Sequence, residues 1–214
     1  MYKKKPFFIV FEGVEGCGKS FQSKKLLNNL KKKRIPALLT REPGGTKSAE
    51  LIRNLILKDY FNHDSKEKFD KYTDTLLYLA ARNEHIKNKI DPALKKKSVV
   101  ICDRFTDSTL AYQVYGKNVN INFINNIHKF ILGKIKPNLT FVLKVSTETS
   151  KKRLKKRKTK NRYDNFAQNF YSKAQNSFLK IAKNKKNYFV LNSSKNDNNL
   201  EKKIFKIVSA YLKI

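Results

Sequence analysis

The sequence predicts an α/β protein built around a parallel sheet, because short apolar runs alternate with segments of helical periodicity. Continuous apolar runs are typical of strands that helices cover on both faces. The five runs are residues 7–11, 37–39, 99–102, 139–143 and 188–191. This alternation predicts a three-layer domain with five parallel strands.

Segments between these runs carry apolar residues at helical spacing, which predicts helices over residues 19–33, 49–57, 69–90 and 200–211. The chain has 214 residues, no repeat at a fixed period and no linker rich in Gly, Pro or Ser. We therefore expect a single domain that spans residues 1–214.

The charge balance is unusual, since 48 lysines and arginines against 17 acidic residues give a formal net charge of +31. Such an excess suggests a polyanionic partner, which could be nucleic acid, an anionic membrane or phosphorylated small molecules. Only eight of the basic residues are arginine, and asparagine is abundant, as an AT-rich coding bias would produce. We favour a solvated lysine-rich surface over a nucleic-acid platform, and we expect the few arginines to be informative.

The cysteine content and the hydropathy of the chain indicate its cellular compartment. Two cysteines cannot build a disulfide scaffold, which indicates a reducing environment. No apolar run approaches the roughly 18 residues of a membrane span. The apolar stretch near the N-terminus is also too short for the core of a signal peptide. We expect a soluble, cytoplasmic protein.

A phosphate-binding loop follows the first predicted strand. The motif G-x-x-x-x-G-K-[ST] is matched by Gly13, Val14, Glu15, Gly16, Cys17, Gly18, Lys19 and Ser20. It lies between a strand and a helix, as its mechanism requires. Backbone N–H groups of the loop would surround the phosphates of ATP, and Lys19 would reach the β- and γ-phosphates. The Ser20 hydroxyl would coordinate Mg²⁺.

Two further polar segments follow predicted strands. Asp103 ends the third strand, where a carboxylate could hold Mg²⁺ directly or through water, or could cap a helix. Arg104 beside it favours a phosphate site, because a guanidinium can bind phosphate oxygens with two hydrogen bonds. Arg41 lies in the segment TREPGGT, a tight turn after the second strand.

The order of these segments resembles bacterial thymidylate kinases. The resemblance runs from Phe8 to about Ile181. It rests on FEG with GKS in the loop, TREPGGT at 40–46, AAR at 80–82, DRF at 103–105 and STLAYQ at 108–113. It implies transfer of a phosphoryl group from ATP to dTMP, giving ADP and dTDP, with Mg²⁺ as cofactor. It also implies a P-loop NTPase-like fold with a five-stranded parallel sheet and a homodimer.

The resemblance assigns the acceptor's phosphate and base to particular residues. Arg41, Arg53 and Arg104 match arginines that bind the monophosphate of dTMP. Arg82 matches the arginine that donates a hydrogen bond to thymine. Tyr78 matches a position where the family usually has a phenylalanine stacked on the base. Since Tyr78 precedes Arg82 by four residues, both would share one helix face.

Four more residues match contacts to the nucleoside. Thr109 and Gln113 match polar contacts to the base. Tyr112 matches a ring that crowds the sugar C2′ and disfavours ribonucleotides. Glu15 matches a carboxylate near the 3′-hydroxyl. Another nucleotide or nucleoside kinase remains the rival within this chemistry, and an ATP-dependent nucleic-acid-binding protein is the rival from another class.

The basic segment at residues 151–164 resembles the short mobile lid of the bacterial enzymes. The variable positions of the phosphate loop contain no basic residue, so the resemblance implies that the lid supplies catalytic charge. The candidates are Arg153, Arg157 and Arg162, and the latter two lie nearer the expected lid tip. The lid usually continues with Asp-Arg, whereas this chain has Asn161 before Arg162. Phe105 is a milder departure, because Tyr or His is common there.

Histidines and cysteines offer no site of their own. His63, His85 and His128 lack metal-ligand spacing, among themselves or with the cysteines, so we interpret them as ordinary. Cys17 and Cys102 both lie near predicted strand ends, and we expect buried thiols.

Overall fold

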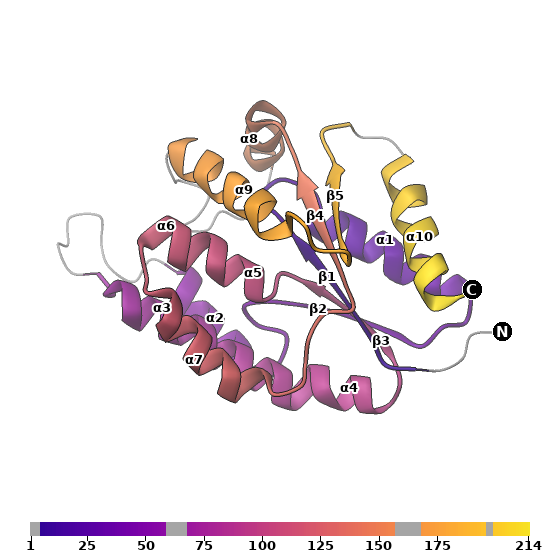
Figure 1. Ribbon diagram of the computed structural model, residues 1–214, viewed down its shortest axis with the longest axis horizontal. Coiled ribbons are helices and arrows are strands. Elements are labelled where there is room, and N and C mark those ends of the chain that lie inside the picture. Colours follow the sequence, from indigo (N-terminus) through magenta and orange to yellow (C-terminus); the bar gives the residue numbers. More distant parts are fainter. Residues whose placement is uncertain (1–4, 59–67, 157–167, 196–198) are drawn as a thin grey trace.

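Five parallel strands form one sheet in the computed structural model, which describes residues 5–58, 68–156, 168–195 and 199–214 (Figure 1). The strands are β1 (Phe7–Glu12), β2 (Ala37–Arg41), β3 (Val99–Asp103), β4 (Leu139–Lys144) and β5 (Tyr188–Asn192). Their order is β2-β3-β1-β4-β5, and all neighbouring pairs are parallel. The predicted sheet is confirmed, and each strand contains the apolar run that predicted it.

Helices cover both faces of the sheet, which gives the expected three layers (Figure 1). One face is covered by α1 (Lys19–Lys32) and α10 (Asn199–Leu212). The other is covered by α3 (Lys71–His85), α4 (Asp91–Lys95), α5 (Thr106–Thr109), α7 (Ile121–Leu132) and α9 (Gln168–Ala182). Two helices lie further out: α2 (Lys47–Leu57) packs against α3, and α8 (Thr147–Lys155) follows β4.

Side chains of β1 alternate between the two layers. Phe11 packs in a cluster with Leu26 of α1, whereas Phe8 packs with Ile86 and Phe105 on the opposite face. All six residues of β1 are buried, because helices cover both sides of this central strand. The continuous apolar run in the sequence has this physical origin.

Two π-helical turns interrupt the helical segments. The helix predicted over residues 69–90 is α-helical only to His85, and the turn Ile86–Ile90 then leads into α4. A second turn, Leu110–Val114, lies between α5 and α6 (Tyr115–Lys117). Such turns occur frequently at functional sites. Helices α7 and α9 were not predicted from the sequence. Among the described helices, none is long and apolar enough to cross a membrane.

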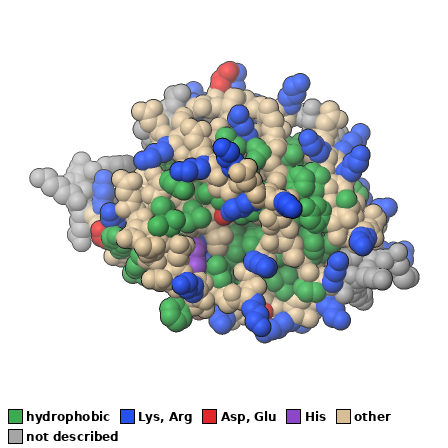
Figure 2. Space-filling model, in the orientation of Figure 1, with side chains coloured by type: hydrophobic (Ala, Val, Ile, Leu, Met, Phe, Trp, Pro, Cys, Tyr) green, Lys and Arg blue, Asp and Glu red, His purple; other side chains and the backbone are tan. Residues whose placement is uncertain are grey.

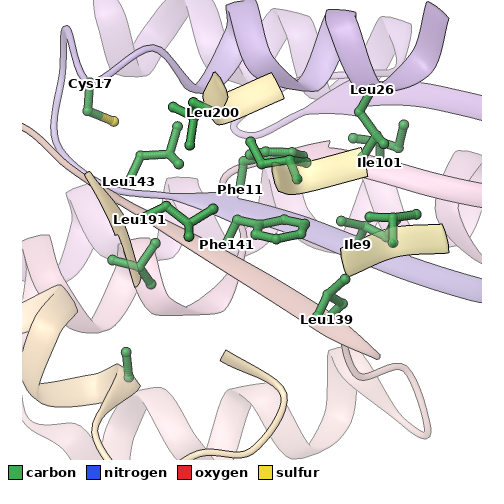
Figure 3. Close-up of a cluster of buried hydrophobic side chains, with 14 of the residues drawn as sticks. Ile9, Phe11, Cys17, Leu26, Ile101, Leu139, Phe141, Leu143, Leu191 and Leu200 are labelled. Atoms are coloured by element: carbon green, nitrogen blue, oxygen red, sulfur yellow. The ribbon is translucent and has the colours of Figure 1, made fainter. Parts of the chain in front are cut away.

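The ring of Phe141 should be a large contributor to stability. It is fully buried, and it stacks on Phe11 with ring centroids 5.2 Å apart (Figure 3). We expect Phe141→Ala to lower the free energy of unfolding by about 3–5 kcal/mol, because it removes these contacts and leaves a cavity. Urea unfolding measures the loss. Val190 on the adjacent strand is 46% exposed, so Val190→Ala should change the free energy of unfolding by less than about 1 kcal/mol.

Candidate functional site

The phosphate loop occupies the connection between β1 and α1, as the motif predicts. Gly13 and Gly16 have φ angles of +136° and +71°, and a Cβ atom at either would lie within 3 Å of a backbone oxygen. Only glycine fits this path without strain. Gly18 precedes α1, and the first N–H groups of the helix can bind a phosphate. Nζ of Lys19 donates to the carbonyls of Gly13 (2.9 Å) and Val14 (2.8 Å).

Ser20 and Asp103 lie together beside this loop. They come from the start of α1 and the end of β3, and β3 is the neighbour of β1 in the sheet. The Ser20 hydroxyl donates a hydrogen bond to the Asp103 carboxylate. Two adjacent oxygen groups of this kind are the ligands that Mg²⁺ prefers.

A cavity of about 580 Å³ opens next to the loop. Its lining includes all nine residues that the resemblance assigned to the acceptor: Glu15, Arg41, Arg53, Tyr78, Arg82, Arg104, Thr109, Tyr112 and Gln113. Gly16, Gly18, Lys19, Ser20 and Asp103 also line it, which connects the cavity to the phosphate loop. Gly13, Val14 and Cys17 are not part of the lining. Cys17 and Cys102 are buried free thiols, as expected.

Glu15 joins two of the predicted residues at one side of the cavity. Its carboxylate accepts from Arg104 Nη2 (2.7 Å) and from the Tyr112 hydroxyl (2.8 Å). The Arg104 guanidinium lies over the Tyr112 ring, and its Nη1 donates to Ser108 and to Gly13. Arg104 itself has a φ of +75°, a strained conformation for a residue other than glycine. These contacts hold it there.

Glu50 joins the other two predicted phosphate-binding arginines. Both of its oxygens accept from Arg41 Nη2, at 3.2 and 3.1 Å, and Arg53 Nε lies 3.9 Å from Oε2. The Gly45 N–H also donates to it (2.9 Å). Burial would raise the pKa of the Glu50 carboxyl, but the Gly45 N–H and Arg41 outweigh burial and lower it. Burial and the nearby charge of Arg41 lower the pKa of Arg53.

Arg82 is buried in the cavity wall, with 3% of its surface exposed. Its Nε donates to Glu42 (2.7 Å), and its Nη2 donates to the carbonyl of Phe105 (2.9 Å). Its Nη1 is bonded to both Thr109 Oγ1 (2.8 Å) and His128 Nε2 (2.9 Å). Arg82 therefore has a structural role in addition to the predicted one.

Glu42 extends this network to the second strand. Its Oε1 accepts from His85 Nδ1 (3.1 Å), and His85 Nε2 contacts the Thr40 hydroxyl (2.6 Å). Burial would raise the pKa of the Glu42 carboxyl, but Arg82 and His85 outweigh it and lower the pKa. The carboxylate is thus ionised, paired and buried.

Tyr78 and Gln113 complete the wall near Arg82. Gln113 lies in the π-helical turn with 2% of its surface exposed, and its Nε2 has no hydrogen-bond partner among the described residues. A buried donor without a partner is costly, so a ligand that offers an acceptor here would be favoured.

The lid region is described only in part. Helix α8 ends at Lys155, and Arg157 and Arg162 lie outside the described residues. Arg153 lines the cavity and donates to the carbonyls of Gly16 (3.2 Å) and Ser193 (2.8 Å). It therefore ties α8 to the phosphate loop.

Sequence similarity to known proteins identifies the family. Residues 11–204 match the thymidylate kinase family. Thymidylate kinase of Wolbachia pipientis wMel is 41% identical over 177 residues, which cover 82% of this chain and 84% of that protein. The enzyme of Mycoplasma capricolum is 37% identical over 210 residues, 96% of each chain. The chain belongs to the thymidylate kinase family.

A solved thymidylate kinase has the same fold. The crystal structure of the enzyme from Ehrlichia chaffeensis matches with a TM-score of 0.74 and 29% identity, and the match covers 95% of this chain and 99% of that one. The P-loop NTPase-like fold predicted from the sequence is confirmed. Thymidylate kinases transfer the γ-phosphoryl group of ATP to dTMP, so this chain is a nucleoside monophosphate kinase.

Several residues at the thymidylate kinase site were not identified from the sequence. Glu42 and Glu50 hold the predicted arginines, yet only Glu42 lies within a quoted motif. His85 and His128, which we interpreted as ordinary, are buried against Glu42 and Arg82. No local pattern marks the contacts of Glu42, His85 and His128, because they join residues at least 40 positions apart in the chain.

Glu12 is a further buried carboxyl behind the phosphate loop. It is 1% exposed, and it accepts from the N–H groups of Phe105 (2.8 Å) and Ser108 (3.2 Å) and from the Ser108 hydroxyl (2.6 Å). Burial, and then the charge of Asp107, raise the pKa of Glu12 from 4.5 to about 8. Between these values the folded chain holds a proton that the unfolded chain has released.

This difference predicts a pH-dependent stability. The protonated Glu12 contributes fully to the free energy of unfolding below about pH 4.5. This contribution is lost as the pH rises through about 8. Relative to Glu12→Gln, the wild type should lose free energy of unfolding between about pH 5 and pH 8, by up to about 1.4 kcal/mol per pH unit. Urea unfolding across this range measures it. Glu148→Gln, at an exposed carboxylate, should show no such trend, and a constant difference for Glu12→Gln would contradict the assignment.

Proposed function

We propose that this chain transfers the γ-phosphoryl group of ATP to dTMP, giving dTDP and ADP for dTTP biosynthesis. One observation carries the proposal: the nine residues that the resemblance assigns to the acceptor line a single cavity, and that cavity reaches Lys19 of the phosphate loop. A donor phosphate on the loop and an acceptor phosphate in the cavity would therefore meet. Catalysis of phosphoryl transfer depends mainly on such positioning and on stabilisation of charge.

The donor binds the loop from Gly13 to Ser20 in this proposal. Backbone N–H groups and Lys19 contact the phosphates of ATP. The adjacent oxygens of Ser20 and Asp103 support a Mg²⁺ site, with the metal held directly or through water. When bound, Mg²⁺ would neutralise part of the phosphate charge.

The acceptor phosphate binds Arg41, Arg53 and Arg104. Glu50 supports this role, because it brings Arg41 and Arg53 together at the cavity wall. Arg104 is fixed by Glu15 on the opposite side, so its position is set before the substrate arrives. Guanidinium groups suit this task because their geometry matches phosphate oxygens.

The nucleoside of dTMP occupies the inner part of the cavity. Tyr78 stacks on thymine, and Arg82, Thr109 and Gln113 provide polar contacts to the base. The unpartnered Nε2 of Gln113 supports a base that presents an acceptor there. At the sugar, Tyr112 limits the space around C2′, and Glu15 lies near the 3′-hydroxyl.

The lid supplies the remaining charge in the transition state. The loop offers no arginine, and the segment 151–164 contains Arg153, Arg157 and Arg162. Arg153 already contacts the loop carbonyl of Gly16, which supports closure of this segment over the phosphates. An arginine in that position can contribute roughly 10³-fold or more to the rate.

Exposed leucines support a homodimer. Leu51 and Leu55 on α2 and Leu76 on α3 are 70%, 43% and 47% exposed, although α2 and α3 pack together. Apolar surface of this kind is typical of interfaces between copies of a chain. A cytoplasmic location fits the two unpaired thiols.

The surface charge gives little support to a nucleic-acid-binding function. Figure 2 shows Lys and Arg spread over the visible face rather than gathered in one stripe. An organised basic and aromatic surface would be expected of a nucleic-acid-binding protein.

Kinase activity across the nucleoside monophosphates tests the proposal. With ATP and Mg²⁺, dTMP should give the fastest release of ADP. Lys19→Ala should lower turnover on the order of 100-fold, because it removes a charge directed at the transferred group. Lys24→Ala on the same helix, outside the cavity lining, should retain activity. Tight nucleic-acid binding without dTMP kinase activity would favour the rival function.

Two variants of Tyr78 test stacking on the base. Tyr78→Phe should leave the KM for dTMP nearly unchanged, because stacking uses the ring and not the hydroxyl. Tyr78→Ala should raise it about tenfold with little effect on the KM for ATP. Steady-state kinetics in both substrates measure this. Equal losses in the two variants would show that the ring is not the binding group.

A further inference from the structure

The guanidinium of Arg82 is held on nearly all sides by the protein. An arginine side chain has five N–H donors, and four of them are used by Glu42, Thr109, His128 and the Phe105 carbonyl. Its Cζ also lies 5.3 Å from the centre of the Phe105 ring. These bonds leave one N–H on Nη2, and Arg82 lines the acceptor cavity. The direction of that N–H is fixed by the other four bonds.

His128 must accept in this network. Arginine has only donors, so the hydrogen bond between Arg82 Nη1 and His128 Nε2 requires an unprotonated Nε2. The imidazole is then neutral, with its proton on Nδ1. Burial, and then the charge of Arg82, lower the pKa of His128 to about 3, which agrees with this geometry.

We propose that His128 is a positioning residue for base recognition, whose neutral imidazole holds Arg82 so that its remaining N–H faces the base of the acceptor. The inference rests on the proposed function. His128 comes from α7, whereas the other three partners of Arg82 come from the connection after β2, the connection between β3 and α5, and α5 itself. Among the described contacts, it is the one that ties the guanidinium to α7.

The chemistry of the base follows from this arrangement. An N–H that faces the base requires a carbonyl oxygen and disfavours an exocyclic amine, because two donors would then meet. Gln113 Nε2 is a second donor in the same wall. Without His128, Nη1 of Arg82 would lack one acceptor, and the guanidinium could tilt toward the vacated side. Discrimination between dTMP and dCMP should then fall.

Two substitutions separate positioning from simple packing. His128→Leu removes the acceptor, whereas His128→Gln keeps an oxygen acceptor at a similar distance from the backbone. In His128→Leu the KM for dTMP should rise about tenfold, the preference for dTMP over dCMP should fall about tenfold, and the KM for ATP should stay within about twofold. His128→Gln should recover most of both losses. An unchanged KM for dTMP in the leucine variant, or no recovery with glutamine, would overturn the inference.

Arg82 itself is less suitable for this test, because its removal would leave the buried Glu42 carboxylate without its arginine partner. Ile124→Ala is the matched control: Ile124 lies one turn earlier on α7, is fully buried and packs in an apolar cluster with Leu79. It should lower the melting temperature and leave the dTMP preference unchanged. A shifted preference in this control would assign the effect to packing of α7.

Nuclear magnetic resonance of the wild type gives a readout that does not depend on folding of a variant. At about pH 6 the ¹⁵N shifts of His128 should identify a neutral ring with its proton on Nδ1. A charged ring, or a proton on Nε2, would overturn the inference even if the enzyme is active. Absence of dTMP kinase activity in the wild type would instead refute the proposed function, so the two failures are distinguishable.

Discussion

The buried ion pair between Glu42 and Arg82 is the interaction on which the site depends. The two side chains are 4% and 3% exposed, and a charge buried to this extent is tolerated only when it is paired and its other polar atoms are bonded. Glu42 follows β2, and Arg82 lies on α3. Because their other partners come from the β3–α5 connection, α3, α5 and α7, the pair joins several elements of one helical layer to the sheet edge. The shape of the acceptor cavity is thereby fixed before any substrate binds.

The same pairing of a carboxylate with an arginine recurs around the cavity. Arg104 is held by Glu15, and Arg41 is held by Glu50. In a chain with 48 basic and 17 acidic residues, most lysines cannot have an acidic partner. Three of the carboxylates nevertheless hold arginines of the cavity wall. Arginine is suited to such positions because its planar donors bind a carboxylate in a defined geometry.

Local patterns were enough to predict the strands and the phosphate loop, since each is formed by residues adjacent in sequence. The Glu42–Arg82 and Arg82–His128 contacts join residues 40 and 46 positions apart, and no spacing in the sequence indicates them. Helix α9 is a different case, because Phe170, Ala174 and Phe178 recur at helical spacing and could have predicted it. The acceptor residues were proposed only through the family resemblance. Their common cavity depends on the carboxyl ends of parallel strands meeting at one sheet edge.

The charge that remains at the cavity explains why an anion should bind there. Glu50 is shared by Arg41 and Arg53, so these three groups together carry one positive charge in excess. The neighbouring charge of Arg41 already lowers the pKa of Arg53, after burial, which is evidence of repulsion between the two cations. A phosphate dianion between them would replace this repulsion with attraction. Because Glu50 and the Gly45 N–H have already oriented the arginines, little of the binding energy would be needed to arrange them. Glu50 thus holds Arg41 and Arg53 in the arrangement that the proposed phosphate site requires.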